Sequence, residues 1–419
     1  MATNVVRQAI MGLDKSLLGY ELVYEYGEGA LFNQPDSKAA GTIEDFLTQL
    51  DSEKFMGGEK AFITFTPNLL LRGIPKIFKP SSLVVQIGDS TIVHPDTQKQ
   101  ILELRREGYS VAVNDFEFSP RFLSLLDTVD YIKLDMRAAD ESTANIVNIG
   151  RSFNKKVIAT RCDTDALYET AKKAGCEYFQ GTVVAHAMSS KVTRMDHLQS
   201  NFFQLMIAVT RDEPDVDEIA TIISRDVTLA FSVIKMVNSA YFALRNRVRS
   251  VKQALVVLGL GQLKQWVYLL SFHESDNAMS AEMIKTSFLR ANFCSELAQY
   301  VRNVQIAKSD AYLMGMFSTL GLLLEVPLHL AIKELPVVDE VRDALLSESG
   351  AYAPLYKLVL AYECADWAKM NECAEVLGLS PATVSQKYFE CVEYVNNIWQ
   401  TLLHPYKGDA AEDEEDIEE

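Results

Sequence analysis

The pattern of apolar residues changes near residue 185, and this change divides the chain into two differently built parts. Before that point, short apolar runs rich in β-branched and aromatic residues alternate with amphipathic segments. Such runs, separated by helices, are typical of strands in a parallel sheet. After that point, apolar residues recur at three- and four-residue spacing, which is typical of helices. We therefore expect an α/β domain followed by an all-α domain.

Eight strand-like runs occur in the first part. They are Val5–Met11, Leu17–Tyr24, Ala61–Phe65, Leu83–Ile87, Ser110–Val113, Tyr131–Leu134, Val157–Thr160 and Tyr178–Gln180. The amphipathic segments Pro95–Glu107 and Asp163–Ala174 lie between them. A strand count close to eight favours a closed (β/α)8 barrel of the TIM type over an open sheet.

The second part is predicted to be a helical bundle. Helices are expected at roughly 198–210, 215–224, 227–239, 250–258, 261–273, 280–302 and 309–324, from the apolar periodicity. A last long helix should begin at Ser380 and Pro381, because serine is a favoured N-cap and proline fits the first helical turn.

Composition and charge argue against several classes of function. The net charge of −17 opposes binding to nucleic acid. The basic stretch Arg245, Arg247, Arg249 and Lys252 is interpreted as a solvated loop, with a nucleic-acid contact as the alternative. No apolar run is long enough to span a bilayer, so membrane insertion is not expected. Residues 1–10 lack the apolar core of a signal peptide, which favours a cytoplasmic location.

Cysteine and histidine do not form a metal-binding or disulfide pattern. The six cysteines include no CxxC pair, and the six histidines are dispersed. In a chain of this size such cysteines are interpreted as reduced and mostly buried. The acidic tail, residues 406–419, is predicted to be disordered by its composition.

Polar residues stand at or near the ends of several predicted strands. The carboxyl ends of barrel strands meet at one mouth, where barrel enzymes carry their chemistry. Hydrolysis of a phosphodiester at such a mouth needs divalent metal, which is held by several carboxylates. Here most of these positions are neutral, and the six are Glu21, Thr64, Gln86, Asn114, Asp115 and Thr160.

The first part resembles the EAL-domain cyclic di-GMP phosphodiesterases over about residues 1–190. The resemblance is carried by GYELVYE (Gly19–Glu25), VNDFEF (Val113–Phe118), DYIKLD (Asp130–Asp135) and EYFQG (Glu177–Gly181), and by RQAI (Arg7–Ile10) at the start. It implies a TIM-like barrel.

By this resemblance, some family residues are retained. Glu21 and Asp115 match metal ligands, and Lys133 matches the lysine that helps to activate water. Gln180 matches a retained glutamine near the ligand.

The same comparison implies that the metal site has been dismantled. Thr64, Gln86, Asn114 and Thr160 replace the family's asparagine, glutamate, aspartate and glutamate. Glu25 stands where the family has an arginine that meets the ligand phosphate. We expect no metal cofactor, with Mg²⁺ or Mn²⁺ needed only if phosphodiesterase activity persists. Lys133 is interpreted either as a structural partner of Asp115 or as a residual ligand contact.

The second part resembles the HDOD domain, a helical relative of HD-type phosphohydrolases, over about residues 197–405. KMVNSA (Lys235–Ala240) and SVKQALVVLG (Ser250–Gly259) carry this resemblance. The family's metal-binding His–Asp pair falls on Ser318 and Thr319, whose hydroxyls do not replace an imidazole and a carboxylate. Asn238 and Ser239 are interpreted as a recognition spot or as residues that make capping and turn hydrogen bonds.

These resemblances imply a non-catalytic bacterial signalling or scaffold protein that acts through protein–protein contacts. Two alternatives stay open. The barrel is a cyclic di-GMP receptor without turnover, or a residual metal-dependent phosphodiesterase that relies on Glu21, Asp115 and Lys133. Expected partners are other signalling proteins, and a homodimer is compatible with the pairing of EAL barrels.

Overall fold

The computed structural model describes most of both predicted domains. The described ranges are 4–24, 52–92, 95–117, 119–181, 214–225, 247–270, 278–323, 327–333 and 337–403, with a few single positions between them. Glu25, Ser239 and the acidic tail lie outside the described residues, and the predicted helices at 198–210 and 227–239 lie largely outside them.

The first domain is a closed barrel whose eight strands pair in the order in which they occur along the chain. They are β1 (Val5–Gly12), β2 (Leu17–Tyr24), β3 (Ala61–Thr64), β4 (Leu83–Ile87), β5 (Ser110–Val113), β6 (Tyr131–Asp135), β7 (Lys156–Thr160) and β8 (Tyr178–Phe179). Each predicted strand is confirmed, and no strand end differs from its prediction by more than one residue.

Strand β1 runs antiparallel to both of its neighbours, whereas β2 to β8 form parallel ladders. The cause is the short turn after β1, which is too short for a crossover helix and can only reverse the chain. In this turn the Gly12 amide donates to the carbonyl of Ser16 over 2.7 Å, and Lys15 adopts a left-handed φ of 68°. One consequence is that Gln8 lies directly opposite Glu21.

An apolar layer fills the barrel interior. Its buried members are Ile10, Phe62, Val84, Ala112, Tyr131 and Ile158. The rings of Phe62 and Tyr131 meet edge to face, with their centroids 5.3 Å apart. Side chains two residues apart on a strand point to the same side. The residues two positions further toward the mouth therefore form the next layer, which is the polar one.

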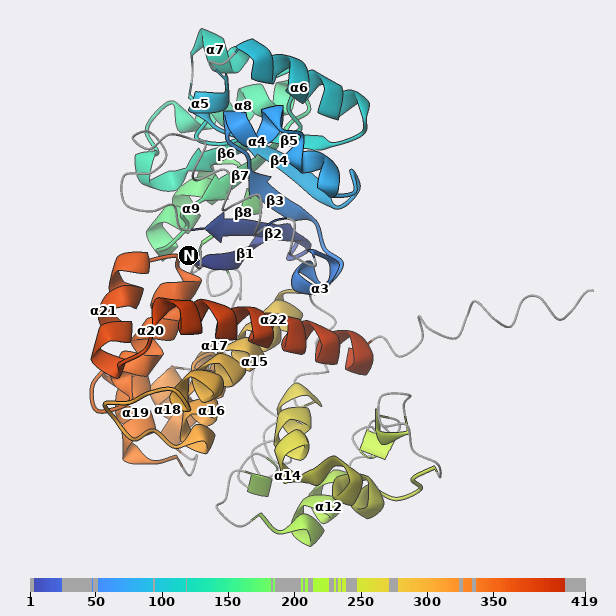
Figure 1. Ribbon diagram of the computed structural model, residues 1–419, viewed down its shortest axis with the longest axis vertical. Helices are drawn as coiled ribbons and strands as arrows, with labels where there is room; N and C mark the ends of the chain where they lie inside the picture. The colour runs from blue at the N-terminus through green and yellow to red at the C-terminus, as the bar shows by residue number, and fades with distance from the viewer. Residues whose placement is uncertain are drawn as a thin grey trace, which may run out of the picture.

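Helices cover the outside of the barrel, as Figure 1 shows. They are α3 (Ser52–Met56), α4 (Pro67–Leu71), α5 (Asp89–Ile92), α6 (Pro95–Arg106), α7 (Pro120–Leu123), α8 (Thr143–Ser152) and α9 (Asp165–Ala174), with the 3-10 turns η1 (Ile74–Ile77) and η2 (Met136–Ala138). Helix α9 begins where the Thr164 side chain accepts the Leu167 amide, and it ends at Gly175 in the left-handed conformation.

The regular elements among the described residues of the second domain are all helices. Its helices are α12 (Val216–Ser224), α14 (Val251–Leu270), α15 (Ala278–Ala298), α16 (Lys308–Phe317), α17 (Leu320–Leu323), α18 (Leu328–Lys333), α19 (Asp339–Leu346), α20 (Ala353–Glu363), α21 (Trp367–Leu377) and α22 (Pro381–Leu403). None of the described helices is both long enough and apolar enough to cross a membrane.

Helix predictions in this domain are confirmed at some points and wrong at others. The start of α22 is confirmed, because the Ser380 hydroxyl accepts the Thr383 amide over 3.1 Å. The single helix predicted over 309–324 is wrong, because the chain leaves the helix at Ser318 and resumes it in α17. The Ser318 hydroxyl donates to the carbonyl of Gly315, a local bond that favours this break.

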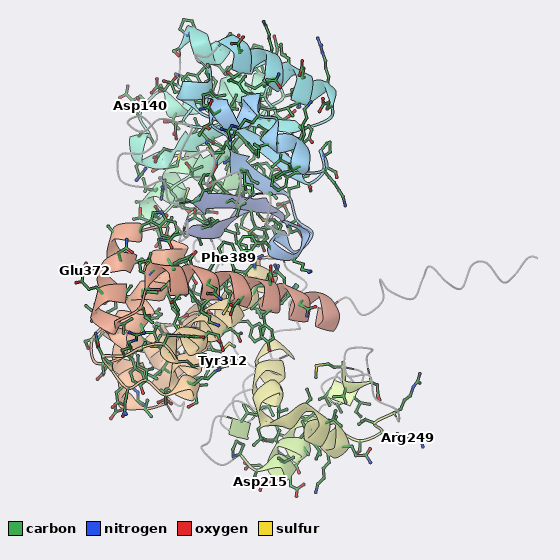
Figure 2. All side chains as sticks on the ribbon, viewed as in Figure 1. Asp140, Asp215, Arg249, Tyr312, Glu372 and Phe389 are labelled. Carbon is green, nitrogen blue, oxygen red and sulfur yellow. The ribbon has the colours of Figure 1, made fainter. Side chains whose placement is uncertain are left out.

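The helical domain packs against the β1 side of the barrel, and α22 lies along this junction (Figure 1). The Asn396 amide of α22 donates to the carbonyls of Lys54 and Phe55 over 2.7 and 2.9 Å. Phe389, labelled in Figure 2, packs at a tilt against Phe55 with ring centroids 5.0 Å apart. Tyr362 of α20 donates to the carbonyl of Val5 over 3.0 Å. The two domains therefore share a packed and hydrogen-bonded interface.

Helices α15 and α16 approach closely at Gly315. A Cβ placed there would lie 2.4 Å from backbone atoms of Arg290, so the helices would have to separate. Gly315→Ala should therefore destabilise the helical domain by about 1–3 kcal/mol. Gly261→Ala is the matched control, since a Cβ at that helical position meets nothing within 4 Å. Calorimetric unfolding at the same temperature for both variants would contradict this prediction.

Candidate functional site at the barrel mouth

The barrel mouth gathers most of the predicted site residues in one polar layer. Thr64, Gln86, Lys133 and Thr160 each follow a member of the apolar layer by two residues on their own strand, and Asn114, two residues after Ala112, directly follows β5. Glu21 comes from β2, and Gln180 directly follows β8. A cavity of about 200 Å³ opens here, lined by Glu21, Asn114, Asp115, Lys133, Thr160 and Gln180 among others.

Glu21 is the anionic centre of this layer. Its carboxylate lies 2.7 Å from the Lys133 ammonium and accepts the Gln86 amide over 2.8 Å. It also accepts the Gln180 amide. The side chains of Glu21 and Lys133 are only 13% and 4% exposed. Burial alone would raise the pKa of Glu21, but the charge of Lys133 and these hydrogen bonds hold it below its ordinary value.

Gln86 completes the contacts of Lys133. Its carbonyl oxygen accepts from the Lys133 ammonium over 2.7 Å, and its amide nitrogen also donates to the Thr64 hydroxyl over 3.0 Å. The Asn114 amide donates to the same hydroxyl over 3.1 Å. Thr160 donates to the carbonyl of Leu134, so its hydroxyl is used by the backbone. The Thr64 hydroxyl thus joins Gln86 and Asn114, whereas Gln86 also bonds to the Glu21–Lys133 pair.

Asp115 stands apart from this network, and the interpretation of Lys133 as its structural partner is wrong. Asp115 follows β5 with a left-handed φ of 49°, whereas Lys133 reaches across the barrel to Glu21. Burial and the nearby Asp135 carboxylate raise the pKa of Asp115. Asp115 and Asp135 also line an adjoining hollow of about 370 Å³.

The donor set in the mouth does not fit a divalent metal. A Mg²⁺ or Mn²⁺ ion is coordinated preferentially by several anionic oxygens. Here an ammonium already lies against the Glu21 carboxylate, and Gln86 directs N–H groups, not oxygen, toward Glu21 and Thr64. Within the described ranges, no group of three histidine, cysteine, aspartate or glutamate side chains is placed to hold a metal ion.

Ser318 and Thr319, which the resemblance aligns with the His–Asp pair, are engaged in structural hydrogen bonds. Ser318 accepts from the Arg290 guanidinium over 3.1 Å, and the buried Thr319 hydroxyl bonds to Ser287. Arg290 is paired with Glu363, with its Nη2 2.7 Å from the carboxylate. The charge of Arg290, which lies beside the Ser318 hydroxyl, is therefore already balanced by the Glu363 carboxylate.

Asn238 makes turn hydrogen bonds, in agreement with one of the two interpretations of this residue. Its amide nitrogen donates to the carbonyls of Ile234 and Val248, and its oxygen accepts the Val248 amide over 2.7 Å. In the basic stretch, Lys252 pairs with Asp217 over 2.5 Å at the surface.

Gln8 is a mouth residue that the sequence analysis missed. Its side chain accepts from Gln180 and lines the cavity. On the reversed strand β1, Gln8 lies two residues from Ile10 of the apolar layer, on the mouth side. The alternation of side chains would have indicated this position only once the reversal of β1 was known.

Family models match both parts of the chain. Residues 46–187 match the EAL domain, and residues 195–332 match the HDOD domain.

Two relatives align over nearly the whole chain. Uncharacterized protein YuxH of Bacillus subtilis is 28% identical and covers 95% of this chain and 99% of its own. Cyclic di-GMP phosphodiesterase CdgJ of Vibrio cholerae is 27% identical, with coverages of 94% and 93%.

Solved structures resemble a smaller part. The PaMucR phosphodiesterase in complex with cyclic di-GMP is 18% identical with a TM-score of 0.36, covering 43% of this chain and 94% of its own. The Klebsiella pneumoniae BlrP1 complex with manganese and cyclic di-GMP is 18% identical with a TM-score of 0.37, with coverages of 44% and 55%.

Proposed function

We propose that this chain, in which an EAL domain precedes an HDOD domain, is a non-catalytic signalling protein that acts by binding other proteins. The observation that carries the proposal is the Lys133–Glu21 ion pair in the barrel mouth. In a working metal site the glutamate would have to be free to bind a cation. Here its charge is balanced by a buried ammonium and its lone pairs accept amide donors.

The helical domain supports the same proposal. Its vestigial positions, Ser318 and Thr319, offer hydroxyls that bond to Arg290 and Ser287. Neither hydroxyl provides the imidazole or carboxylate that a hydrolytic metal centre needs. With neither domain suited to metal-dependent hydrolysis, protein binding is the function that suits both.

The test is hydrolysis of cyclic di-GMP by the full chain with Mg²⁺ or Mn²⁺. We expect no linear dinucleotide above the rate in buffer, measured by chromatography. A calorimetric titration of the same sample then separates two non-catalytic roles. Saturable heat without product would make the barrel a receptor, and no heat would make it a scaffold.

The name of the relative CdgJ favours a second candidate, a cyclic di-GMP phosphodiesterase. Under this candidate, Asp115 and Glu21 would hold the metal once Lys133 had moved aside. Asp115→Asn is the decisive variant, because it keeps the shape of the side chain and removes the only carboxylate outside the Glu21 network that matches a family ligand. Product formation by the wild type that disappears in Asp115→Asn would overturn the non-catalytic proposal.

A further inference from the structure

Gln8 contacts both domains with a single side-chain amide. Its oxygen accepts from Gln180 in the barrel mouth over 3.0 Å. Its nitrogen donates to the backbone carbonyl of Glu363, at the end of α20, also over 3.0 Å. Both bonds form only when the Gln8 side chain holds one orientation, so the position of Gln180 and the end of α20 constrain each other.

The contact continues into the helical domain through the side chain of Glu363. Arg290 of α15 donates from Nε to both carboxylate oxygens over 2.9 Å, and the pair is about four-fifths buried. Arg290 also donates to Ser318, which in turn donates to the carbonyl of Gly315 on α16. Residues of α15, α16 and α20 are therefore fixed around one carboxylate.

A series of polar contacts thus connects the barrel mouth to Ser318, and at Glu363 it passes through the covalent link between the main-chain carbonyl and the side-chain carboxylate. Its members, in order, are Lys133, Glu21, Gln180, Gln8, Glu363, Arg290 and Ser318. Low local dielectric strengthens such contacts and makes the loss of one partner costly for the next.

We propose that Gln8 couples the barrel mouth to the helical domain, so that a change at Gln180 weakens the hydrogen bond that fixes the end of α20. A partner or ligand that displaces Gln180 removes the donor from the Gln8 oxygen and frees Gln8 to rotate. The Glu363 carbonyl then loses its donor, and the Arg290 pair beside it relaxes. By reciprocity, a partner that binds and displaces α20 changes the affinity of the mouth for its own ligand by the same coupling free energy.

Other contacts across the interface hold the domains together without reaching the mouth layer. Arg7 donates to Asn396, and Tyr20 donates to Glu282 of α15 over 2.7 Å. Arg7 and Tyr20 are next to Gln8 and Glu21 on their strands and point to the opposite side. A change at Asn396, the partner of Arg7, should therefore loosen the interface and leave the series intact.

The test is hydrogen exchange in the full chain at the end of α20. The amides of Cys364, Ala365 and Asp366 close this helix end by bonding to the carbonyls of Leu360, Tyr362 and Ala361. We expect Gln180→Met to speed their exchange about 5-fold or more, the lower range of allosteric coupling. In a Gln8→Met background, Gln180→Met should add nothing further.

Asn396→Leu is the matched control background. It removes interface hydrogen bonds to Lys54 and Phe55, yet Gln180→Met should act on α20 in it as in the wild type. Exchange in β4 reports whether the barrel stays folded. If Gln180→Met unfolds the barrel, Gln180→Asn is used in its place, because its amide is too short to reach Gln8. The proposal is overturned if exchange at 364–366 is unchanged, or if it rises equally with Gln8 replaced.

Discussion

Replacing Lys133 by methionine should lower the free energy of unfolding of the barrel by about 3–5 kcal/mol at pH 7. In the structure the Glu21 side chain is only 13% exposed. The variant therefore leaves a largely buried carboxylate with no cation beside it. Gln86 and Gln180 still donate to Glu21, but neutral amides do not balance its charge. An uncompensated buried charge is among the most destabilising changes that one substitution can make.

The pH dependence of this loss follows from the pKa of Glu21. In the wild type this pKa is lowered, so the stabilisation by the ionised carboxylate is complete above its ordinary value of about 4.5 and is lost as pH falls through the lowered value. Without Lys133, burial raises the pKa of Glu21. The deficit of Lys133→Met should therefore be largest at neutral pH and should shrink as the pH falls and Glu21 takes up a proton.

Two further variants make this prediction specific. Glu21→Gln combined with Lys133→Met makes the site neutral and should recover most of the lost stability. Lys172→Met removes an exposed lysine whose ion pair with Glu169 spans 3.8 Å, and should cost about 1 kcal/mol or less. Exchange in the barrel strands is the suitable readout, because all three tryptophans lie in the helical domain. Equal stability of Lys133→Met and Lys172→Met would contradict the prediction.

The strands could be predicted closely from sequence because most of their residues are apolar and buried. The run Leu83–Ile87 is buried along its whole length and agrees with β4 at both ends. The reversal of β1 was not predicted, since apolar periodicity reports burial and not strand direction.

The candidate site was predicted less completely than the fold. The polar residues of the mouth could be found because parallel strands bring their carboxyl ends together. The choice of Glu21 over Asp115 as the partner of Lys133 depends on distances across the closed barrel, which sequence spacing does not encode. Likewise, the contact of Gln8 with Glu363 joins residues 355 positions apart and depends on how the two domains pack.

Introducing carboxylates into the mouth should make the stability of the chain depend on metal. The variant that combines Gln86→Glu, Asn114→Asp and Thr160→Glu replaces neutral side chains of the mouth layer with anionic ones beside Glu21. Without metal, these carboxylates repel one another and should lower the melting temperature. Added Mg²⁺ or Mn²⁺ binds the folded state and should stabilise it by about 2.7 kcal/mol at 100 times the dissociation constant.

The wild type should show no such response, because Lys133 already supplies the cation that Glu21 needs and Gln86 presents amide hydrogens to its neighbours. Sodium chloride at matched ionic strength controls for general screening of surface charge. Gln86→Glu alone should respond weakly, since one added carboxylate competes with Glu21 for the same ammonium. If Mg²⁺ raised the melting temperature of the wild type as much as that of the triple variant, the mouth would be a metal site. The non-catalytic proposal would then lose its physical basis.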